Sequence, residues 1–384
     1  MNNSLTSKSM VISATDHVFM ARALRLAERG LYTTMPNPRV GCVLVKDGEV
    51  IAEGWHYRAG EAHAEVHALH QAGEQARGST AYVSLEPCSH SGKTGPCCEA
   101  LIAAGVARVV YAMEDPNPAV AGRGIEKLQA AGIQADGPLL EDSARALNPG
   151  FIKRMERKRP FVRCKLAMSL DGRTAMASGQ SKWITGRKAR EDVQRLRARS
   201  CAIISGVDTV LRDNASLTVR ADELQLVNAA DAAAHQPLRV ILDSSLRLSR
   251  QSEILNHPFP ILLIHNGSAA HAEALTGWPG HVECLALPER EGRIDLGAVL
   301  DDLARRECNE VLVEAGARLA GSFLRRGLLD EVIIYMAPKL LGSNARPLFD
   351  LPLNTMAAAL PLKIQDMRAV GDDWRITLIP DMEH

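Results

Sequence analysis

The stretch that decides the fold of the first half of this chain is His63-Ala64-Glu65, followed by Pro87-Cys88 and then by Pro96-Cys97. One histidine and two cysteines form a ligand set that suits zinc, and three protein ligands leave a fourth position open for water. Zinc lowers the pKa of that water, so that hydroxide is available at neutral pH. We therefore expect His63, Cys88 and Cys97 to bind zinc, and the nearby carboxylate of Glu65 to carry the proton.

The spacing of these residues favours two helix starts. Residues two apart in the middle of a helix do not face one another, so His63 and Glu65 can share a site only where a helix begins. Cys97 follows Pro96 at a second expected helix start, where the helix dipole favours a thiolate. His-x-Glu with Pro-Cys-x-x-Cys is the signature of zinc enzymes that deaminate a base. Here the two cysteines stand nine positions apart, which departs from that signature.

Other interpretations of the same residues stay open at this point. His63, His67 and His70 follow a helical spacing and could form an all-histidine site or a polar helix face. The order His-Ala-Glu-Val-His is not the His-Glu-x-x-His of metalloproteases, so that chemistry is excluded. The cysteines could also hold a purely structural zinc ion, or Cys88 and Cys97 could form a disulfide.

Length, charge and cysteine usage limit the classes of protein. A chain of 384 residues exceeds the size at which one hydrophobic core usually stops growing, so two domains are expected. Lys plus Arg and Asp plus Glu both number 45, so no overall charge attracts nucleic acid or an anionic membrane. No apolar run approaches the ~20 residues that span a bilayer, and the N-terminus lacks the apolar segment of a secretory signal. With cysteines too sparse for a disulfide scaffold, we expect a cytoplasmic protein.

Strand and helix patterns alternate along the chain. In the first half, helices are expected over 16–29, 63–76, 97–104 and 122–131, and strands over 40–45, 50–52, 80–85 and 107–113. The Asp47-Gly48 pair predicts a hairpin turn between the first two strands. In the second half, helices such as 187–199 and 300–306 separate strands expected over 161–169, 201–205, 239–243, 261–265, 310–315 and 331–337. The second half is therefore expected to form a mainly parallel sheet with helices on both faces.

Two stretches lack a core pattern. Residues 148–160 form a charged run that is typical of a solvated linker or a helix end, and we place the domain boundary within it. The expected domains are 1–155 and 156–384. Residues 221–236 are rich in Ala and Gln, which suggests an insertion loop and not a core element.

The long loop between the cysteines points to a particular family. The segment from Pro87 to Cys97 resembles the zinc loop of the riboflavin-biosynthesis deaminases, in which this longer loop is characteristic. The resemblance continues over nearly the whole chain, from about Asp16 to Trp374. Where the family usually has Pro-Pro-Cys-Ala, this chain has Gly95-Pro96-Cys97-Cys98, which places a second thiol beside the expected ligand. Further motifs that match are Pro36-Asn37-Pro38-Arg39-Val40-Gly41, Gly54-Trp55-His56, Asp115-Pro116-Asn117-Pro118, Lys165-Leu166-Ala167-Met168-Ser169-Leu170-Asp171-Gly172-Arg173, Ser181-Lys182-Trp183-Ile184-Thr185 and Glu314-Ala315-Gly316-Ala317-Arg318.

The resemblance is to the bifunctional deaminase/reductase of bacterial riboflavin biosynthesis. It implies an α/β protein with an N-terminal cytidine-deaminase-like α/β/α domain and a C-terminal dihydrofolate-reductase-like α/β domain. The first domain is expected to deaminate 2,5-diamino-6-(5-phosphoribosylamino)pyrimidin-4-one at zinc. The second is expected to use NADPH to reduce the ribosyl group, with the hydride going to the sugar C1′ and not to the pyrimidine ring. The resemblance also implies a homo-oligomer, a dimer or tetramer joined through the reductase domains.

Candidate reductase residues come partly from the pattern and partly from the resemblance. Glycines between a strand end and a helix start let a phosphate approach backbone N–H groups, which makes Gly316, Gly321 and Ser322 cofactor candidates. The resemblance adds the remaining NADPH candidates, which are Ala167, Trp183, Thr209, Asp213, Ser244, Ala317, Arg318, Leu319 and Ala320. It assigns the substrate to Lys165, Ser181, Arg197, Leu217, Arg220, Glu314 and, in the first domain, Asn37. Arginines are suited to the substrate phosphate because guanidinium binds it with two parallel hydrogen bonds.

Two rival functions were weighed against this one. The first is a deaminase of nucleosides or RNA with a non-catalytic second domain. An RNA substrate is disfavoured, because binding to the phosphate backbone needs positive charge and this chain has no net charge. A structural-zinc domain joined to a nucleotide-sensing module is disfavoured by Glu65, which a structural site does not require.

Overall fold

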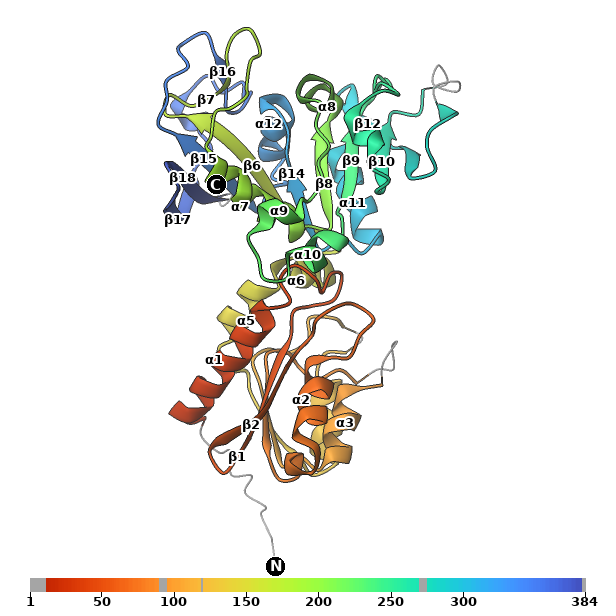
Figure 1. Cartoon of the computed structure of the whole chain (residues 1–384), viewed down its shortest axis with the longest axis vertical. Coiled ribbons are helices and arrows are strands. Elements are labelled where there is room, and N and C mark those ends of the chain that lie inside the picture. Colours follow the sequence, from red (N-terminus) through yellow and green to blue (C-terminus); the bar gives the residue numbers. More distant parts are fainter. Residues whose placement is uncertain (1–11, 90–94, 119, 269–274, 382–384) are drawn as a thin grey trace, which may run out of the picture. The chain divides into compact units, whose positions relative to one another are not determined.

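The structure is a computed structural model that describes residues 12–89, 95–118, 120–268 and 275–381. The chain folds into two units, of which the first ends at Glu156 and the second begins at Arg157. Each unit has its own central sheet (Figure 1). Among the described residues, no helix combines the length and the apolar character needed to cross a bilayer.

The first unit is built on a five-stranded sheet of order β2-β1-β3-β4-β5. β1 is antiparallel to β2 and β3, whereas β3, β4 and β5 run parallel. Its elements in chain order are α1 (Ala14–Glu28), β1 (Gly41–Lys46), β2 (Glu49–Trp55), α2 (Ala64–Ala72), the 3-10 helix η1 (Gly73–Ala76), β3 (Thr80–Val83), α3 (Cys97–Ala104), β4 (Arg108–Tyr111), α4 (Arg123–Ala130), β5 (Gln134–Asp136), α5 (Glu141–Leu147) and α6 (Pro149–Arg157).

Alternation along β1 divides the core of this unit into two layers. Cys42 and Leu44 belong to the apolar cluster under α2 and α3, whereas Val43 and Val45 belong to the cluster under α1 and α5. Figure 1 shows α1 and α5 on one side of the sheet and α2 and α3 on the other. The expected hairpin is confirmed, with Asp47 and Gly48 both at positive φ, as a two-residue turn between twisted strands requires.

The charged run at the end of the first unit, for which a solvated linker or a helix end was expected, is largely helical, and the two units meet within it. α6 spans Pro149–Arg157 and buries Phe151 and Ile152. Ile152 packs in the same cluster as Met20 of α1. Two apolar residues on one face are enough to dock a short helix whose other positions are charged.

The second unit is built on a nine-stranded sheet of order β11-β10-β9-β8-β14-β6-β15-β18-β17. The strands from β11 to β15 run parallel, and β18 and β17 add an antiparallel edge. The elements are β6 (Phe161–Ser169), β7 (Arg173–Ala175), α7 (Arg187–Ala198), β8 (Ala202–Gly206), α8 (Val207–Asp213), α9 (Ala221–Leu224), α10 (Ala229–Ala234), β9 (Leu238–Leu242), η2 (Glu253–Asn256), β10 (Ile261–His265), β11 (Val282–Ala286), β12 (Glu289–Arg290), β13 (Arg293–Ile294), α11 (Leu296–Arg305), β14 (Glu310–Val313), α12 (Ala317–Arg325), β15 (Glu331–Ala337), β16 (Arg346–Pro347), η5 (Met356–Ala358), β17 (Leu362–Val370) and β18 (Asp373–Pro380).

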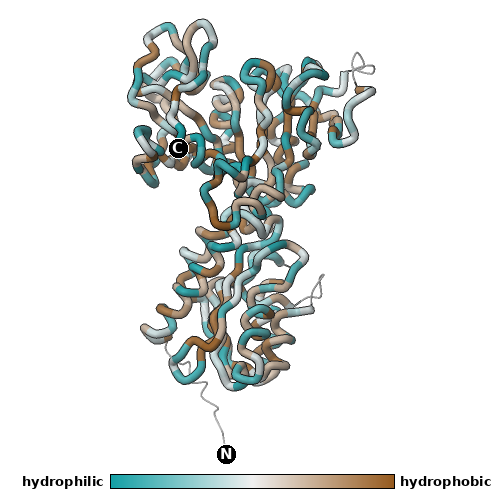
Figure 2. Tube along the Cα trace, in the orientation of Figure 1, coloured by the Kyte–Doolittle hydropathy of each residue, from teal (hydrophilic) through white to brown (hydrophobic). Residues whose placement is uncertain are grey.

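Helices cover both faces of this sheet, as the alternating pattern predicts. Residues of α11 and α12 pack in one apolar cluster, and residues of α7 and α8 pack in another. Strands β10 and β14 are buried along their whole length, and Figure 2 shows hydrophobic segments along the central strands. Strands covered on both faces read as continuous apolar runs, which is why they are visible in the sequence.

Residues 221–236 are not an insertion loop. They form α9 and α10, and they bury Leu224 and Ala232 completely. The frequent alanines of this stretch are therefore the small residues of two short packed helices.

Candidate active sites

Three residues in the first unit converge on one point. His63 is the N-cap residue of α2, Cys97 is the first residue of α3, and Cys88 lies in the loop after β3. The His63 Nδ1 atom lies 3.2 Å from Cys97 Sγ and 3.6 Å from Cys88 Sγ, and all three ligand atoms lie within 4.8 Å of one another. These separations suit a tetrahedral zinc ion with bonds of ~2.0 Å to nitrogen and ~2.3 Å to sulfur.

Backbone geometry holds these ligands in place. Gly54 of β2 packs directly on the start of α2, because a Cβ atom there would lie 2.2 Å from the carbonyl oxygen of Ala64. The backbone N–H of Cys97 donates to Cys88 Sγ at 3.3 Å, and that of Cys98 donates to the Cys88 carbonyl at 3.1 Å. The first turn of α3 therefore fixes both the thiol and the peptide of Cys88.

The electrostatics favour a thiolate at Cys88. The hydrogen bond from the Cys97 thiol, helped by His63 and by the Cys97 amide, outweighs burial and lowers the pKa of Cys88 to about 4. The same pairing, together with burial, raises the pKa of Cys97. The hydrogen bond with Cys88 raises the pKa of His63, because the negative sulfur stabilises the imidazolium.

Glu65 lies in the first turn of α2 and is 3% exposed. Burial, together with the negative charge at Cys88, raises the pKa of Glu65 to about 7. A carboxyl group with a pKa near the working pH can both take up and return a proton. The structure therefore brings together a metal ligand set and a group suited to move protons.

The competing histidines and the extra thiol lie elsewhere. His67 and His70 are exposed and stand outside the cluster of ligand atoms, so the all-histidine alternative is excluded. No disulfide joins Cys88 to Cys97. Cys98 is fully buried among the apolar residues under α2 and α3, so its side chain packs in the core.

Asn37 is linked to the ligand His63 through one intervening side chain, that of His56. Its Nδ2 donates to His56 Nε2 at 3.1 Å, because His56 Nδ1 donates its own proton to the carbonyl of Ala62 at 3.0 Å. The rings of His56 and His63 meet edge to face, with centroids 5.3 Å apart. The family loop residues His90 to Thr94 lie outside the described residues.

The second unit contains a cavity of about 1560 Å³. It lies where β8, β9 and β14 end, which is the usual place for a ligand in an open parallel sheet. Most of the residues expected to bind NADPH or substrate line it, namely Lys165, Ala167, Ser181, Trp183, Arg197, Thr209, Asp213, Leu217, Arg220, Ser244, Glu314, Gly316, Ala317, Arg318, Leu319 and Ser322.

Two expected cofactor residues do not reach this cavity. Ala320 is fully buried in the core, and a Cβ atom on Gly321 would lie 2.5 Å from the carbonyl oxygen of Asp350. Both lie on the packed face of α12, whereas Arg318, Ser322 and Arg325 line the cavity. A glycine at position 321 therefore allows α12 to pack closely on the backbone of Asp350. The glycine pattern between the strand and the helix does not reveal this contact.

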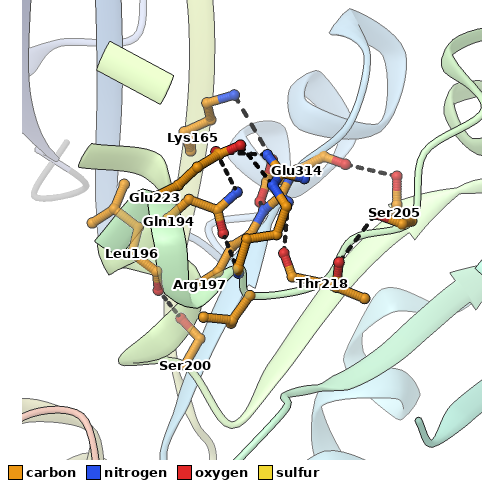
Figure 3. Close-up of polar contacts among 12 residues, drawn as sticks. Lys165, Gln194, Leu196, Arg197, Ser200, Ser205, Thr218, Glu223 and Glu314 are labelled. Atoms are coloured by element: carbon orange, nitrogen blue, oxygen red, sulfur yellow. Dashed lines mark hydrogen bonds and ion pairs between the residues drawn. The ribbon is translucent and has the colours of Figure 1, made fainter. Parts of the chain in front are cut away.

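Glu314 is the centre of a charged group in the cavity wall (Figure 3). Arg197 donates to both of its carboxylate oxygens, at 2.6 and 3.0 Å, and Lys165 Nζ lies 3.8 Å away. Burial opposes ionisation of Glu314, but Arg197 and Lys165 prevail and lower its pKa to about 2. Arg197 also donates to the carbonyl of Thr218 at 3.0 Å. Its guanidinium thus bonds both to Glu314 and to the backbone.

The segment that carries Trp183 borders the cavity and has little regular structure. Ser181 donates to Asp213 at 3.3 Å, and Lys182 Nζ donates to the Asp213 carbonyl at 2.9 Å. Trp183 is 64% exposed, and the guanidinium of Arg190 lies 4.5 Å from the centroid of the Trp183 ring. An indole this exposed has surface available for a flat ligand.

Sequence reasoning missed two cavity residues on α7. Gln194 and Arg190 line the cavity about one and two helical turns before Arg197. Gln194 accepts from the backbone N–H of Arg220 at 3.1 Å and donates to Glu223 at 3.2 Å. The spacing 190, 194, 197 marks one helix face, and this signal could have found both residues once Arg197 was a candidate.

Comparison with known families divides the chain at the same place as the fold. Residues 13–113 match the cytidine and deoxycytidylate deaminase zinc-binding region, and residues 160–376 match the RibD C-terminal domain. The second match alone covers more than half of the chain.

Individual relatives match from end to end. The riboflavin biosynthesis protein RibD of Escherichia coli strain K12 is 51% identical over 368 residues, which cover 95% of this chain and 99% of that protein. A crystal form of Acinetobacter baumannii RibD is 47% identical, with a TM-score of 0.87 over 96% of this chain and 99% of that one. A deaminase/reductase from Thermotoga maritima is 34% identical, with a TM-score of 0.83 over 95% and 99%. The chain therefore belongs to the RibD family of riboflavin biosynthesis, whose members join a zinc-dependent pyrimidine deaminase to an NADPH-dependent reductase.

Proposed function

We propose that His63, Cys88 and Cys97 hold the catalytic zinc ion and that Glu65 is the catalytic proton carrier of the deaminase. The observation that carries this proposal is the convergence of the three ligand atoms within 4.8 Å, with a buried carboxyl group two residues from one of them. When bound, zinc supplies an activated water at neutral pH. The substrate of the deaminase is 2,5-diamino-6-(5-phosphoribosylamino)pyrimidin-4-one, in agreement with the compound named for the Thermotoga maritima protein.

Glu65 moves the proton in this assignment. Its raised pKa allows the carboxylate to take one proton from the attacking water and deliver it to the ring nitrogen. It would then take a second proton, from the hydroxyl group formed by that addition, and deliver it to the amino group that leaves as ammonia. Asn37 is the substrate-binding residue nearest to this site, and its amide is oriented by the hydrogen bond to His56. A buried glutamate has no role in a purely structural zinc site, which disfavours that alternative.

In the second unit we assign NADPH and the deaminated substrate to the large cavity. Gly316 is the N-cap residue of α12, so the first N–H groups of that helix are available to the cofactor's phosphates. Ala167, Trp183, Thr209, Asp213 and Ser244 line the same cavity. NADPH supplies the hydride, which goes to the sugar C1′.

The substrate side of the cavity is assigned to the charged group around Glu314. Lys165 carries its ammonium 3.8 Å from Glu314, where it can polarise the opened sugar. Arg197 holds Glu314, and Ser181, Leu217 and Arg220 complete the substrate wall.

The decisive experiment is Glu65→Gln in the full chain. We expect zinc content to stay at the parent value while ammonia release falls by at least 100-fold, because a single proton-transfer group contributes 10²–10⁴-fold. NADPH oxidation with the deaminated intermediate should be unchanged. Ammonia release at the parent rate would show that Glu65 has no such role.

We also propose a cytoplasmic homo-oligomer that forms along the outer strand β17. This strand is exposed over most of its length and ends the sheet, so its backbone groups are open to a second chain. Ile364, Met367 and Trp374 are exposed apolar residues on β17 and β18. None of the eight cysteines, all of which lie among the described residues, is in a disulfide, and this suits a reducing compartment. Light scattering of the parent and of Ile364→Lys tests this proposal, which a monomeric parent would contradict.

A further inference from the structure

The buried carboxylate of Glu86 has no part in the chemistry described above. It lies two positions before the ligand Cys88 and is 3% exposed. Its Oε2 accepts the backbone N–H groups of Asp115 at 3.1 Å and Gly122 at 3.0 Å, and its Oε1 accepts that of Gly124 at 2.9 Å. A buried carboxylate with three backbone donors is a strong and specific anchor, because charged hydrogen bonds exceed neutral ones.

All three donors belong to one segment, which runs from the end of β4 into the first turn of α4 (Arg123–Ala130). Two of the three donors, Gly122 at the N-cap and Gly124 in the first turn, carry N–H groups that the start of a helix leaves without partners inside the helix. Gly124 brings this helix onto the zinc loop itself, because a Cβ atom there would lie 2.1 Å from the Pro87 carbonyl oxygen. The α4 turn is thus in contact with the peptide that leads directly into Cys88.

Cys88 is consequently fixed from two sides. From one side, the first turn of α3 donates N–H groups to its thiol and its carbonyl. From the other side, the first turn of α4 holds Glu86 and packs on Pro87. The residues that orient a metal ligand commonly change metal affinity by 10–100-fold when they are replaced.

We propose that Glu86 is the positioning residue of the zinc site, which fixes the Cys88 ligand by binding the loop that precedes it to α4. The proposal rests on the zinc ligands assigned above. It also gives a role to the Asp115-Pro116-Asn117-Pro118 motif, whose first residue supplies one of the three N–H donors.

Glu86→Gln is the first test. A glutamine has one acceptor oxygen, so it can keep at most two of the three hydrogen bonds and must turn its NH₂ group toward a backbone N–H. We expect the zinc dissociation constant of the full chain, measured by competition with a chromophoric chelator, to rise 10–100-fold. NADPH oxidation with the deaminated intermediate should stay at the parent rate.

A second variant and a matched control separate positioning from general stability. Gly124→Ala disturbs the same contact from the α4 side, and we expect it to weaken zinc binding as well. Asp16→Asn is the control, because Asp16 is equally buried in the same unit and bonds to Ser13, Tyr82 and Arg108 away from the ligands. It should lower the melting temperature while the zinc dissociation constant stays at the parent value.

The outcomes distinguish this inference from the zinc assignment. If Cys88→Ala still binds zinc as the parent does, the ligand assignment itself fails. If Cys88→Ala loses zinc but Glu86→Gln and Gly124→Ala bind it with the parent dissociation constant and only melt earlier, as Asp16→Asn does, Glu86 is a stability residue and the inference is overturned.

Discussion

Glu314 accepts two hydrogen bonds from the guanidinium of Arg197, at 2.6 and 3.0 Å, in the wall of the reductase cavity. The two residues stand 117 positions apart, one on α7 and the other just after β14. Their pairing keeps a carboxylate charged in a buried position, because the guanidinium offers two parallel donors at the spacing of the two oxygens. The cavity thus contains a fixed negative charge with a lysine beside it.

The first prediction concerns acid stability. The pKa of Glu314 is lowered to about 2, so folding favours its ionised form. That contribution is complete above the ordinary carboxyl pKa and is lost as the pH falls from about 5 toward 2, and it amounts to roughly 3 kcal/mol at most. Urea unfolding of the parent and of Glu314→Gln should therefore differ about equally at pH 7 and pH 5, and progressively less at pH 4 and pH 3. A difference that does not change with pH would contradict this prediction.

Lys165→Met provides the companion measurement. The Lys165 ammonium is the second cation that lowers the pKa of Glu314, after Arg197. Its removal should leave the pH dependence in place but make it smaller, since the Arg197 pair remains.

Much of the fold could be predicted because its signals are local. The helix Cys97–Ala104 was predicted with its observed bounds, since Pro96 precedes it and Gly105 ends it in the left-handed conformation. Strands β6, β10 and β15 also have the predicted bounds. β10 and β15 are largely apolar runs with most residues buried, as expected of strands that are covered on both faces.

The parts that could not be predicted depend on tertiary contacts. α6 buries only Phe151 and Ile152 in a run of charges, which gives no visible period. β17 alternates apolar and polar residues, but the alternation is interrupted by an irregularity between Ile364 and Asp366, and the strand is exposed along most of its length, so it does not show one core-facing set of residues. The pairing of Arg197 with Glu314 depends on the sheet order and the packing of α7, which no local pattern contains.

The second prediction concerns the adjacent cysteines. Cys98 is fully buried in the core under α2 and α3, and its side chain is absent from the ligand cluster. We expect Cys98→Ala to keep one zinc per deaminase site and to cost about 1 kcal/mol of stability, as a small buried truncation does. Cys97→Ala is the matched variant and should lose the metal. Metal analysis of the two purified proteins decides the point, and zinc loss in Cys98→Ala would make Cys98 a ligand.

The third prediction tests how closely α2 must sit on β2. In Gly54→Ala the new methyl group would lie 2.2 Å from the Ala64 carbonyl oxygen, between the ligand His63 and the proton carrier Glu65. We expect a loss of about 1–3 kcal/mol in stability and a fall of roughly 100-fold in deaminase kcat, because the start of α2 must move. Gly95→Ala is the control, since no atom of the described residues lies within 4 Å of its Cβ position. Equal activities of the two variants would show that this contact does not position the site.

The fourth prediction concerns Lys339, which follows β15 and reaches the segment that carries Trp183. Its Nζ donates to the carbonyl oxygens of Trp183 at 3.1 Å and Ile184 at 2.8 Å. This segment borders the cavity. If it is no longer anchored by Lys339, NADPH binding should weaken more than the chemical step slows. We expect Lys339→Met to raise the NADPH dissociation constant about fivefold, because an exposed charged hydrogen-bond donor contributes ~1 kcal/mol.

Three controls isolate this role of Lys339. Lys339→Arg should restore part of the affinity, since a guanidinium can reach the same carbonyl oxygens. Lys363→Met removes an exposed lysine that pairs with Asp381 at 2.9 Å on another strand, and it should bind NADPH as the parent does. Ammonia release by the deaminase unit of the same chain reports whether each variant is folded. If Lys339→Met binds NADPH with the parent affinity while its deaminase is fully active, the anchoring of the Trp183 segment does not depend on Lys339.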